Sequence, residues 1–250
     1  MNLKYTLAVC VSLISFVFGD ECHECEVRKQ TLAEGWSLNI GVDYVWMSMA
    51  KSPTYSGSTG GISGNITYQK PQEFFGQART VYNLGRLFSS LNNANFYEWY
   101  SEFVAGYCFS SCRRWSITPY VGVGFDFIHD NKSPYHMIDP MKLRYNLYYA
   151  VAGFDLHYRS ANWMAGIQLD CLPTFNQYLR IKNLPESAWI LTNGVGAAAR
   201  LPIAYRCVKT LWMELAPYYR FFPVGACSTL RMGHRNINEY GIFLNLRYFL

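Results

Sequence analysis

The 250-residue chain has little charge and, beyond its N-terminus, no long apolar run. Charged residues make up 16% of the chain, whereas soluble domains average about 25%. A disordered protein would need more charge and far fewer aromatic residues, so disorder is excluded. No later run approaches the roughly 20 apolar residues of a membrane-spanning helix, which argues against a helical membrane protein. The net charge of +5 is small and scattered, so no nucleic-acid partner is expected.

What the chain does contain is apolar residues in short segments. Hydrophobic residues account for 50% of the chain and aromatic residues for 17%. Because no long run collects them, they must be spread over many short elements. The length favours one domain of about 200 residues.

The N-terminus predicts export. Residues 1–19 contain a lysine, an apolar stretch of about a dozen residues and Gly19 before an acidic pair. This pattern is typical of a secretory signal peptide, and the stretch is too short for a membrane anchor. Residues 20–35 are expected to form a flexible periplasmic segment before the main domain, residues 36–250.

Export makes disulfides the default expectation for the cysteines. Removal of residues 1–19 leaves seven cysteines, an odd number, so at least one thiol stays free or pairs between molecules. Cys22 and Cys25 have the spacing of a metal or redox motif, but no second such pair follows. A local or intermolecular disulfide is therefore preferred, and envelope proteins become candidate disulfide partners. No metal or other cofactor is expected.

The main domain shows strand-like alternation from its first residues. In residues 36–46 every even position is apolar or aromatic, while most odd positions are polar. Trp36 and Trp46 fall on the same face, roughly 25 Å apart along the normal of a tilted strand. That spacing matches the apolar band of an outer-membrane barrel, so both are predicted to belong to its aromatic girdles. All seven tryptophans fall within or at the ends of predicted strands, which favours a lipid-facing role for the aromatic excess.

The same period predicts eight strands. They cover residues 36–46, 95–109, 115–127, 143–158, 163–172, 189–203, 211–222 and 240–250. The connections alternate between short and proline-containing long segments, as do the periplasmic turns and outer loops of outer-membrane barrels. Eight strands are the preferred count, and a further strand pair within residues 62–88 would give ten.

Two motifs resemble a known family. The segment 118–124, Thr-Pro-Tyr-Val-Gly-Val-Gly, is similar to a recurrent strand of the eight-stranded outer-membrane β-barrels of Gram-negative bacteria, which include the transmembrane domain of outer-membrane protein A. The chain end resembles the C-terminal assembly signal of such barrels, here Tyr248, Phe249 and Leu250. The resemblance implies an all-β, closed, antiparallel up-and-down transmembrane barrel in the outer membrane. It also implies membrane lipid and the barrel insertion machinery as partners.

Polar residues on the inward strand positions predict the contents of the lumen. They are Asp43, Glu98, Glu102, Asp126, Asp170, Arg200, Glu214, Arg220 and Arg247. An eight-stranded barrel leaves room for little more than side chains. We therefore expect a paired ionic network that fills the lumen, with a narrow or gated pore as the alternative.

The positions of the cysteines along the strands limit which disulfides could form. Cys171 and Cys227 fall near the outer rim. Cys108, Cys112 and Cys207 fall near periplasmic turns. Because a disulfide spans only a short distance, any disulfides should join thiols within each group.

Two other functions compete with a structural role. Some barrels of this size are lipid A-modifying hydrolases, but His157 and Ser160 point to opposite strand faces. Loop positions that could bind a metal or act as a base are His129, Asp130, His136, Asp139 and His234. No catalytic motif supports them, so the chain is predicted not to be an enzyme, and no catalytic residue is assigned. A soluble lipocalin-like carrier would need apolar residues inside the barrel. The preferred function is an integral outer-membrane barrel with a structural or surface-interaction role.

Overall fold

The computed structural model describes residues 35–50, 55–89, 93–111, 114–132, 142–181, 188–227 and 234–250. The predicted signal peptide (1–19) and nearly all of the 20–35 segment lie outside these ranges. Within the described ranges, no helix has the length and apolarity needed to cross a bilayer.

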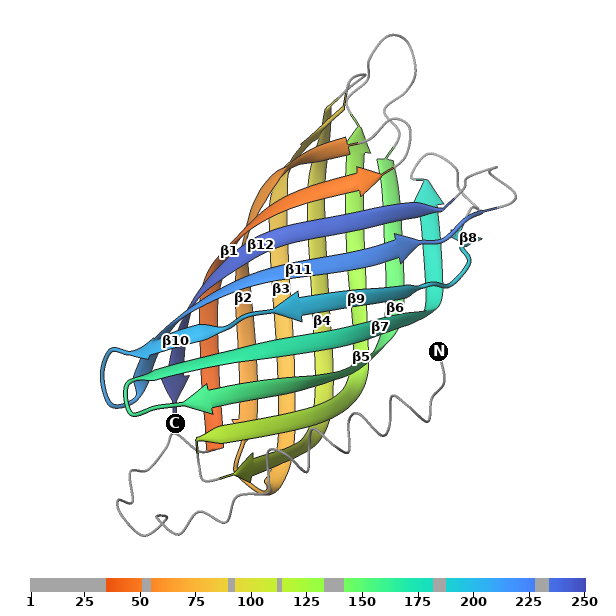
Figure 1. Cartoon of the computed structure of the whole chain (residues 1–250). Helices are drawn as coiled ribbons and strands as arrows, with labels where there is room; N and C mark the ends of the chain where they lie inside the picture. Colours follow the sequence, from red (N-terminus) through yellow and green to blue (C-terminus); the bar gives the residue numbers. More distant parts are fainter. Residues whose placement is uncertain are drawn as a thin grey trace.

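The described chain is built almost entirely from strands (Figure 1). They are β1 (Gly35–Ala50), β2 (Tyr55–Gln69), β3 (Glu73–Phe88), β4 (Asn93–Ser111), β5 (Trp115–Lys132), β6 (Lys142–Arg159), β7 (Trp163–Ile181), β8 (Ala188–Ile190), β9 (Val195–Arg200), β10 (Ile203–Arg206), β11 (Leu211–Val224) and β12 (Arg235–Phe249). Each pairs antiparallel with its neighbours, and β12 pairs with β1, so the sheet closes into a barrel. The predicted closed antiparallel barrel is confirmed.

The ring has ten strand positions, so the preferred count of eight is wrong and the alternative of ten is confirmed. The additional pair is β2 and β3, which lie between β1 and β4. Alternation is weak in β2 because glycine and serine occupy many of its positions. Its pairing with both neighbours, rather than its own sequence, makes this segment a strand.

One position in the ring is interrupted. Sequence periodicity predicts a single strand over residues 189–203, but β8, β9 and β10 divide this stretch, and β9 and β10 both lie between β7 and β11. Pro202, which has no N–H, separates β9 from β10. The wall stays bonded there because Gly166 N donates to Pro202 O (2.9 Å) and Leu201 N donates to Pro217 O (3.0 Å).

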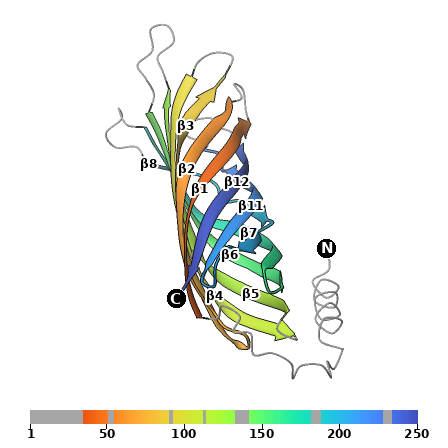
Figure 2. The same ribbon diagram turned by 90° about the vertical axis from the view of Figure 1, so that its left-hand side faces the viewer.

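The barrel has two distinct ends (Figures 1 and 2). The turn end carries the connections at 70–72, 112–114, 160–162 and 207–210, together with Gly35 and Leu250. The loop end carries the strand ends that border residues 51–54, 90–92, 133–141, 182–187 and 228–233. Strand β7 runs to Ile181, well past the predicted end at residue 172, because beyond Pro173 it pairs again with β6 from Thr174 to Ile181 and with β8 from Tyr178 to Arg180.

The outer face is apolar over much of its area. Trp36 is 54% exposed, Trp46 50% and Ile40 63%. This is the reverse of the soluble-carrier arrangement, in which apolar side chains would point inward. Trp99, Trp115 and Trp163 are also exposed. Two tryptophans depart from the lipid-facing interpretation: Trp212 is buried inside the barrel, and Trp189 packs against the inner apolar cluster.

Candidate functional site: the barrel lumen

Arg220 of β11 stands at the centre of the lumen. Its Nη1 lies 2.8 Å from Glu98 Oε1 and 3.3 Å from Glu239 Oε2, and its Nη2 lies 2.7 Å from Asp126 Oδ2. All four side chains are at most 3% exposed. Three carboxylates from β4, β5 and β12 therefore meet one guanidinium, which ties together strands on opposite sides of the barrel.

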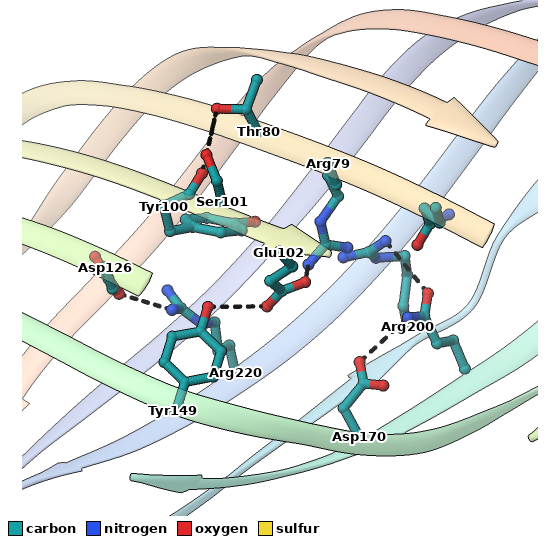
Figure 3. A network of polar contacts seen from close by, with 12 residues as sticks. Arg79, Thr80, Tyr100, Ser101, Glu102, Asp126, Tyr149, Asp170, Arg200 and Arg220 are labelled. Atoms are coloured by element: carbon teal, nitrogen blue, oxygen red, sulfur yellow. Dashed lines mark hydrogen bonds and ion pairs between the residues drawn. The ribbon is translucent and has the colours of Figure 1, made fainter. Parts of the chain in front are cut away.

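A second ion pair lies beside the first. Arg79 of β3 contacts Glu102 of β4, and Glu102 also accepts a hydrogen bond from the Tyr149 hydroxyl (3.0 Å), as Figure 3 shows. The Tyr100 ring links the two pairs, because its centroid lies 4.4 Å from Arg220 Cζ and 5.4 Å from Arg79 Cζ. These groups form one buried layer across the lumen, the central layer. Cation–π contacts of this kind are strongest when desolvated.

Two tyrosines reach this layer by lying across glycines. A Cβ atom at Gly124 would come within 2.7 Å of the Tyr149 hydroxyl, and one at Gly241 within 2.7 Å of the Tyr218 hydroxyl. Each glycine is the direct cross-strand partner of its tyrosine. Because glycine has no side chain, both positions leave room for a tyrosine ring. This explains the presence of Gly124 in the segment 118–124. Tyr218 then donates to Asp43 Oδ2 (3.2 Å).

A polar cavity follows toward the turn end. It is lined by amides, arginines and carboxylates, and the space free of protein atoms among them, open solvent included, is about 500 Å³. Arg247 Nη2 lies 2.6 Å from Glu214 Oε2, and Arg247 Nε donates to Asn39 Oδ1 (3.1 Å). Arg200 donates to Gln168 (3.3 Å), which in turn donates to Asp170 (3.2 Å).

Further polar groups of this cavity are only partly satisfied by the protein. The Tyr120 hydroxyl also donates to Asp170. Several buried polar atoms, including Arg79 Nη1 and His157 Nε2, have no protein partner within the described part of the chain. Unpaired polar atoms around a polar space are what a hydrated cavity requires.

The opposite half of the lumen, toward the loop end, is packed with apolar side chains. Met47, Phe96, Tyr145, Leu147 and Leu179 are all completely buried in one cluster. The cluster meets the central layer where the Tyr149 and Phe222 rings lie 5.0 Å apart. Apolar packing at this density leaves no space for a water column. The lumen is therefore closed on the loop side of Arg220.

The histidines do not assemble a catalytic site among the described residues. His157 faces the cavity with Nδ1 3.2 Å from Asp155 Oδ2, while Ser160 lies in the turn after β6. Ser116 is the cross-strand partner of His157, but the imidazole leans toward β7, where a Cβ at Gly166 would lie 2.8 Å from Nε2. Ser116 is on β5, the other neighbour of β6, so the ring is turned away from this hydroxyl.

The loop candidates are also separated. His129 and Asp130 are adjacent in β5, so His129 points outward and Asp130 is buried inside the barrel. His234 is exposed near the start of β12, and His136 and Asp139 lie outside the described residues. In the described ranges no group of three or more His, Cys, Asp or Glu side chains could hold a metal ion.

The four described cysteines are free thiols. Cys108 is buried near the turn end and Cys207 is exposed there, as expected. Cys227 is buried near the loop end. Cys171 is exposed on the middle of β7 rather than at the outer rim, because that strand continues to Ile181. The remaining cysteines lie outside the described residues: Cys10, Cys22, Cys25 and Cys112.

No protein-family model matches the sequence, and no curated protein matches it. Solved structures do match. One is the outer membrane protease OmpT of Escherichia coli, with a TM-score of 0.58, 8% identity and coverage of 91% of this chain and 100% of that chain. Another is the translocator domain of the autotransporter NalP from Neisseria meningitidis, with a TM-score of 0.50, 8% identity and coverage of 99% and 95%. This chain has the fold of the Gram-negative outer-membrane β-barrels. At such low identity the likeness concerns the fold alone.

Within this barrel, all nine predicted lumen residues are buried or half-buried. Glu98, Asp126 and Arg220 meet in one cluster, Glu214 pairs with Arg247, and Asp170 and Arg200 share Gln168. Glu102 and Asp43 bond to partners that the prediction does not include. At the chain end, Tyr248 and Leu250 point outward, whereas Phe249 packs against Trp212 inside (6.2 Å).

Sequence reasoning missed Arg79, Asn83 and Glu239. The first two lie on β3, where the sequence pattern indicates only a loop or an extra hairpin. The polar residues Gln77, Arg79 and Asn83, alternating with outward residues, were the available signal. Glu239 lies one residue before the predicted start of the last strand, and it faces the lumen because β12 begins at Arg235.

Proposed function

We propose that this chain is an integral outer-membrane barrel that does not conduct and acts as a structural scaffold for its loops. The turn end would face the periplasm, following the usual orientation of such barrels. Support comes from the apolar outer face, the closed ring and the position of the start of β1 and the end of β12 at the rim with short turns. Closure pairs backbone groups between strands, so an apolar face can meet lipid.

The observation that carries the non-conducting role is the filled lumen. The central layer ties Arg220 to three carboxylates, and the apolar cluster fills the space beyond it. A hydrated ion would have to separate buried ion pairs and then cross an apolar region. Both steps are costly, since unpaired charges are poorly tolerated away from water.

Planar-bilayer recording tests this proposal. The purified barrel should insert without giving single-channel conductance. Insertion itself is checked by co-flotation with lipid vesicles and by heat-modifiable migration on gels. A steady conductance from protein that passes both checks would show that the lumen conducts and would overturn the scaffold proposal.

The proposed partners follow from the surface and the chain end. Membrane lipid would contact the outer face, and the barrel insertion machinery would recognise Tyr248, Phe249 and Leu250. Exposed Cys207 at the turn end is the described thiol best placed to link another envelope protein. The proposal assigns no catalytic step, metal or cofactor.

A further inference from the structure

Near the loop end the outer face carries cations that have no exposed carboxylate beside them among the described residues. Arg144 of β6 and Arg180 of β7 are direct cross-strand partners, both exposed, and His129 of β5 is the partner of Arg144 on its other side. Like charges placed directly opposite in a sheet are destabilising. Among the described carboxylates Glu73, at the turn end, is the exposed one; the others are buried or half-buried in the barrel. Arg144 and Arg180, which with His129 form the basic row, therefore carry positive charge that no exposed carboxylate among the described loop-end residues balances.

Aromatic residues lie next to the basic row on its turn-end side. The cross-strand row two residues closer to the turn end, about 7 Å from the basic row, contains Trp99, Phe127 and Tyr178. The Trp99 and Phe127 rings are 5.5 Å apart, and Tyr148 packs edge-on against both Phe127 (6.2 Å) and Tyr178 (6.4 Å). Tryptophan and tyrosine gather where lipid headgroups meet the hydrocarbon core. The basic row then lies at the headgroup level.

We propose that Arg144 and Arg180, with His129 beside them, bind the phosphate group of a membrane lipid on the outer face of the barrel. The phosphate would supply the charge that balances the cross-strand arginine pair. Guanidinium groups bind phosphate through paired N–H donors, and the aromatic residues below contact the acyl chains. This inference rests on the proposed membrane location.

Lipid retention tests the site. The barrel is reconstituted in phosphatidylcholine vesicles containing phosphatidic acid, extracted in detergent, and examined by native mass spectrometry for bound phosphatidic acid. The variant R144Q/R180Q should retain it far less than the wild type, by about fivefold for each arginine removed. The control R114Q/K209Q removes the same charge from exposed turn-end positions and should retain it like the wild type.

A second readout separates binding from misfolding. In pure phosphatidylcholine, R144Q/R180Q should resist urea at least as well as the wild type, because the repulsion between the arginines is gone. Added phosphatidic acid should raise the urea midpoint of the wild type and the control, but not that of R144Q/R180Q.

Several outcomes would overturn the inference. Equal retention by R144Q/R180Q and the wild type would do so, as would equal losses in R144Q/R180Q and R114Q/K209Q. Release of the lipid by inorganic phosphate at equal concentration would show a general anion site instead. Wild-type protein that does not co-float with vesicles would contradict the membrane proposal itself, whereas inserted protein without selective retention would contradict the lipid site alone.

Discussion

The two halves of the lumen are built from the same strands but hold opposite kinds of side chain. Strand β6 shows the change within one element. Its inward residues Leu143 and Leu147, on the loop side, are apolar and buried, whereas Asp155 and His157 line the polar cavity on the turn side. The outer face of the barrel stays largely apolar throughout. The inward residues therefore make one half of the lumen apolar and the other half polar, although both halves are built on the same strands.

The two halves of the lumen meet at Arg220. Of the substitutions considered, removal of its guanidinium should therefore lower the free energy of unfolding most. We expect Arg220→Met to lower the free energy of unfolding by about 3–5 kcal/mol, because Glu98, Asp126 and Glu239 lose their shared cation while buried. Urea unfolding in vesicles, followed by tryptophan fluorescence, measures this. The matched change Arg200→Met removes a half-buried arginine with one 3.3 Å bond to Gln168 and should cost far less. Equal costs would contradict a central role for Arg220.

A polar residue placed in the apolar half, or an apolar residue placed in the polar half, should lower the free energy of unfolding by less than Arg220→Met does. The two changes should also differ in size. Leu147→Asn places an unpartnered amide in the completely buried apolar cluster and should cost about 3 kcal/mol. Gln77→Leu in the polar cavity loses a 3.3 Å bond to Thr67 and should cost only about 1 kcal/mol. The same urea titration compares them. Similar losses would mean that the two halves are equally dry.

The rate at which the native thiols are modified compares the two ends of the barrel without any substitution. In vesicles, a water-soluble maleimide should modify exposed Cys207 fastest and buried Cys108 slowly, since Cys108 borders a small pocket at the turn end. Cys227, in the apolar cluster, and Cys171, on the lipid-facing surface, should be protected. Peptide mapping by mass spectrometry resolves the sites. Fast modification of Cys171 in vesicles would place that face in water.

The barrel is predictable from the sequence where inward and outward residues differ strongly. In β1 the even positions from Trp36 to Trp46 are apolar, and all of them point outward. The same reasoning failed for β2, where Gly60, Gly61 and Gly64 give neither face a character, and where pairing with β1 and β3 decides the structure. The period of the sequence did not reveal the interruption at Pro202. The wall continues there because backbone groups of neighbouring strands bond to the residues around it.

The contents of the lumen were predicted by type but not by arrangement. Alternation identifies which residues face inward, so Glu98, Asp126 and Arg220 could be named. Their meeting depends on strands far apart in the sequence crossing the same interior, which no local period encodes. The glycines that admit Tyr149 and Tyr218 depend likewise on cross-strand register.

The first and last strands, β1 and β12, are neighbours in the closed ring. β1 and β12 pair from Ser37 with Phe249 to Ala50 with Asn236, and Leu250 N donates to Trp36 O (3.0 Å). The junction between first and last strand is thus bonded like any junction between consecutive strands. The ring of strands has no structural first member. A circularly permuted barrel, in which Leu250 is joined to Gly35 and new ends are opened at a loop, would therefore form the same wall.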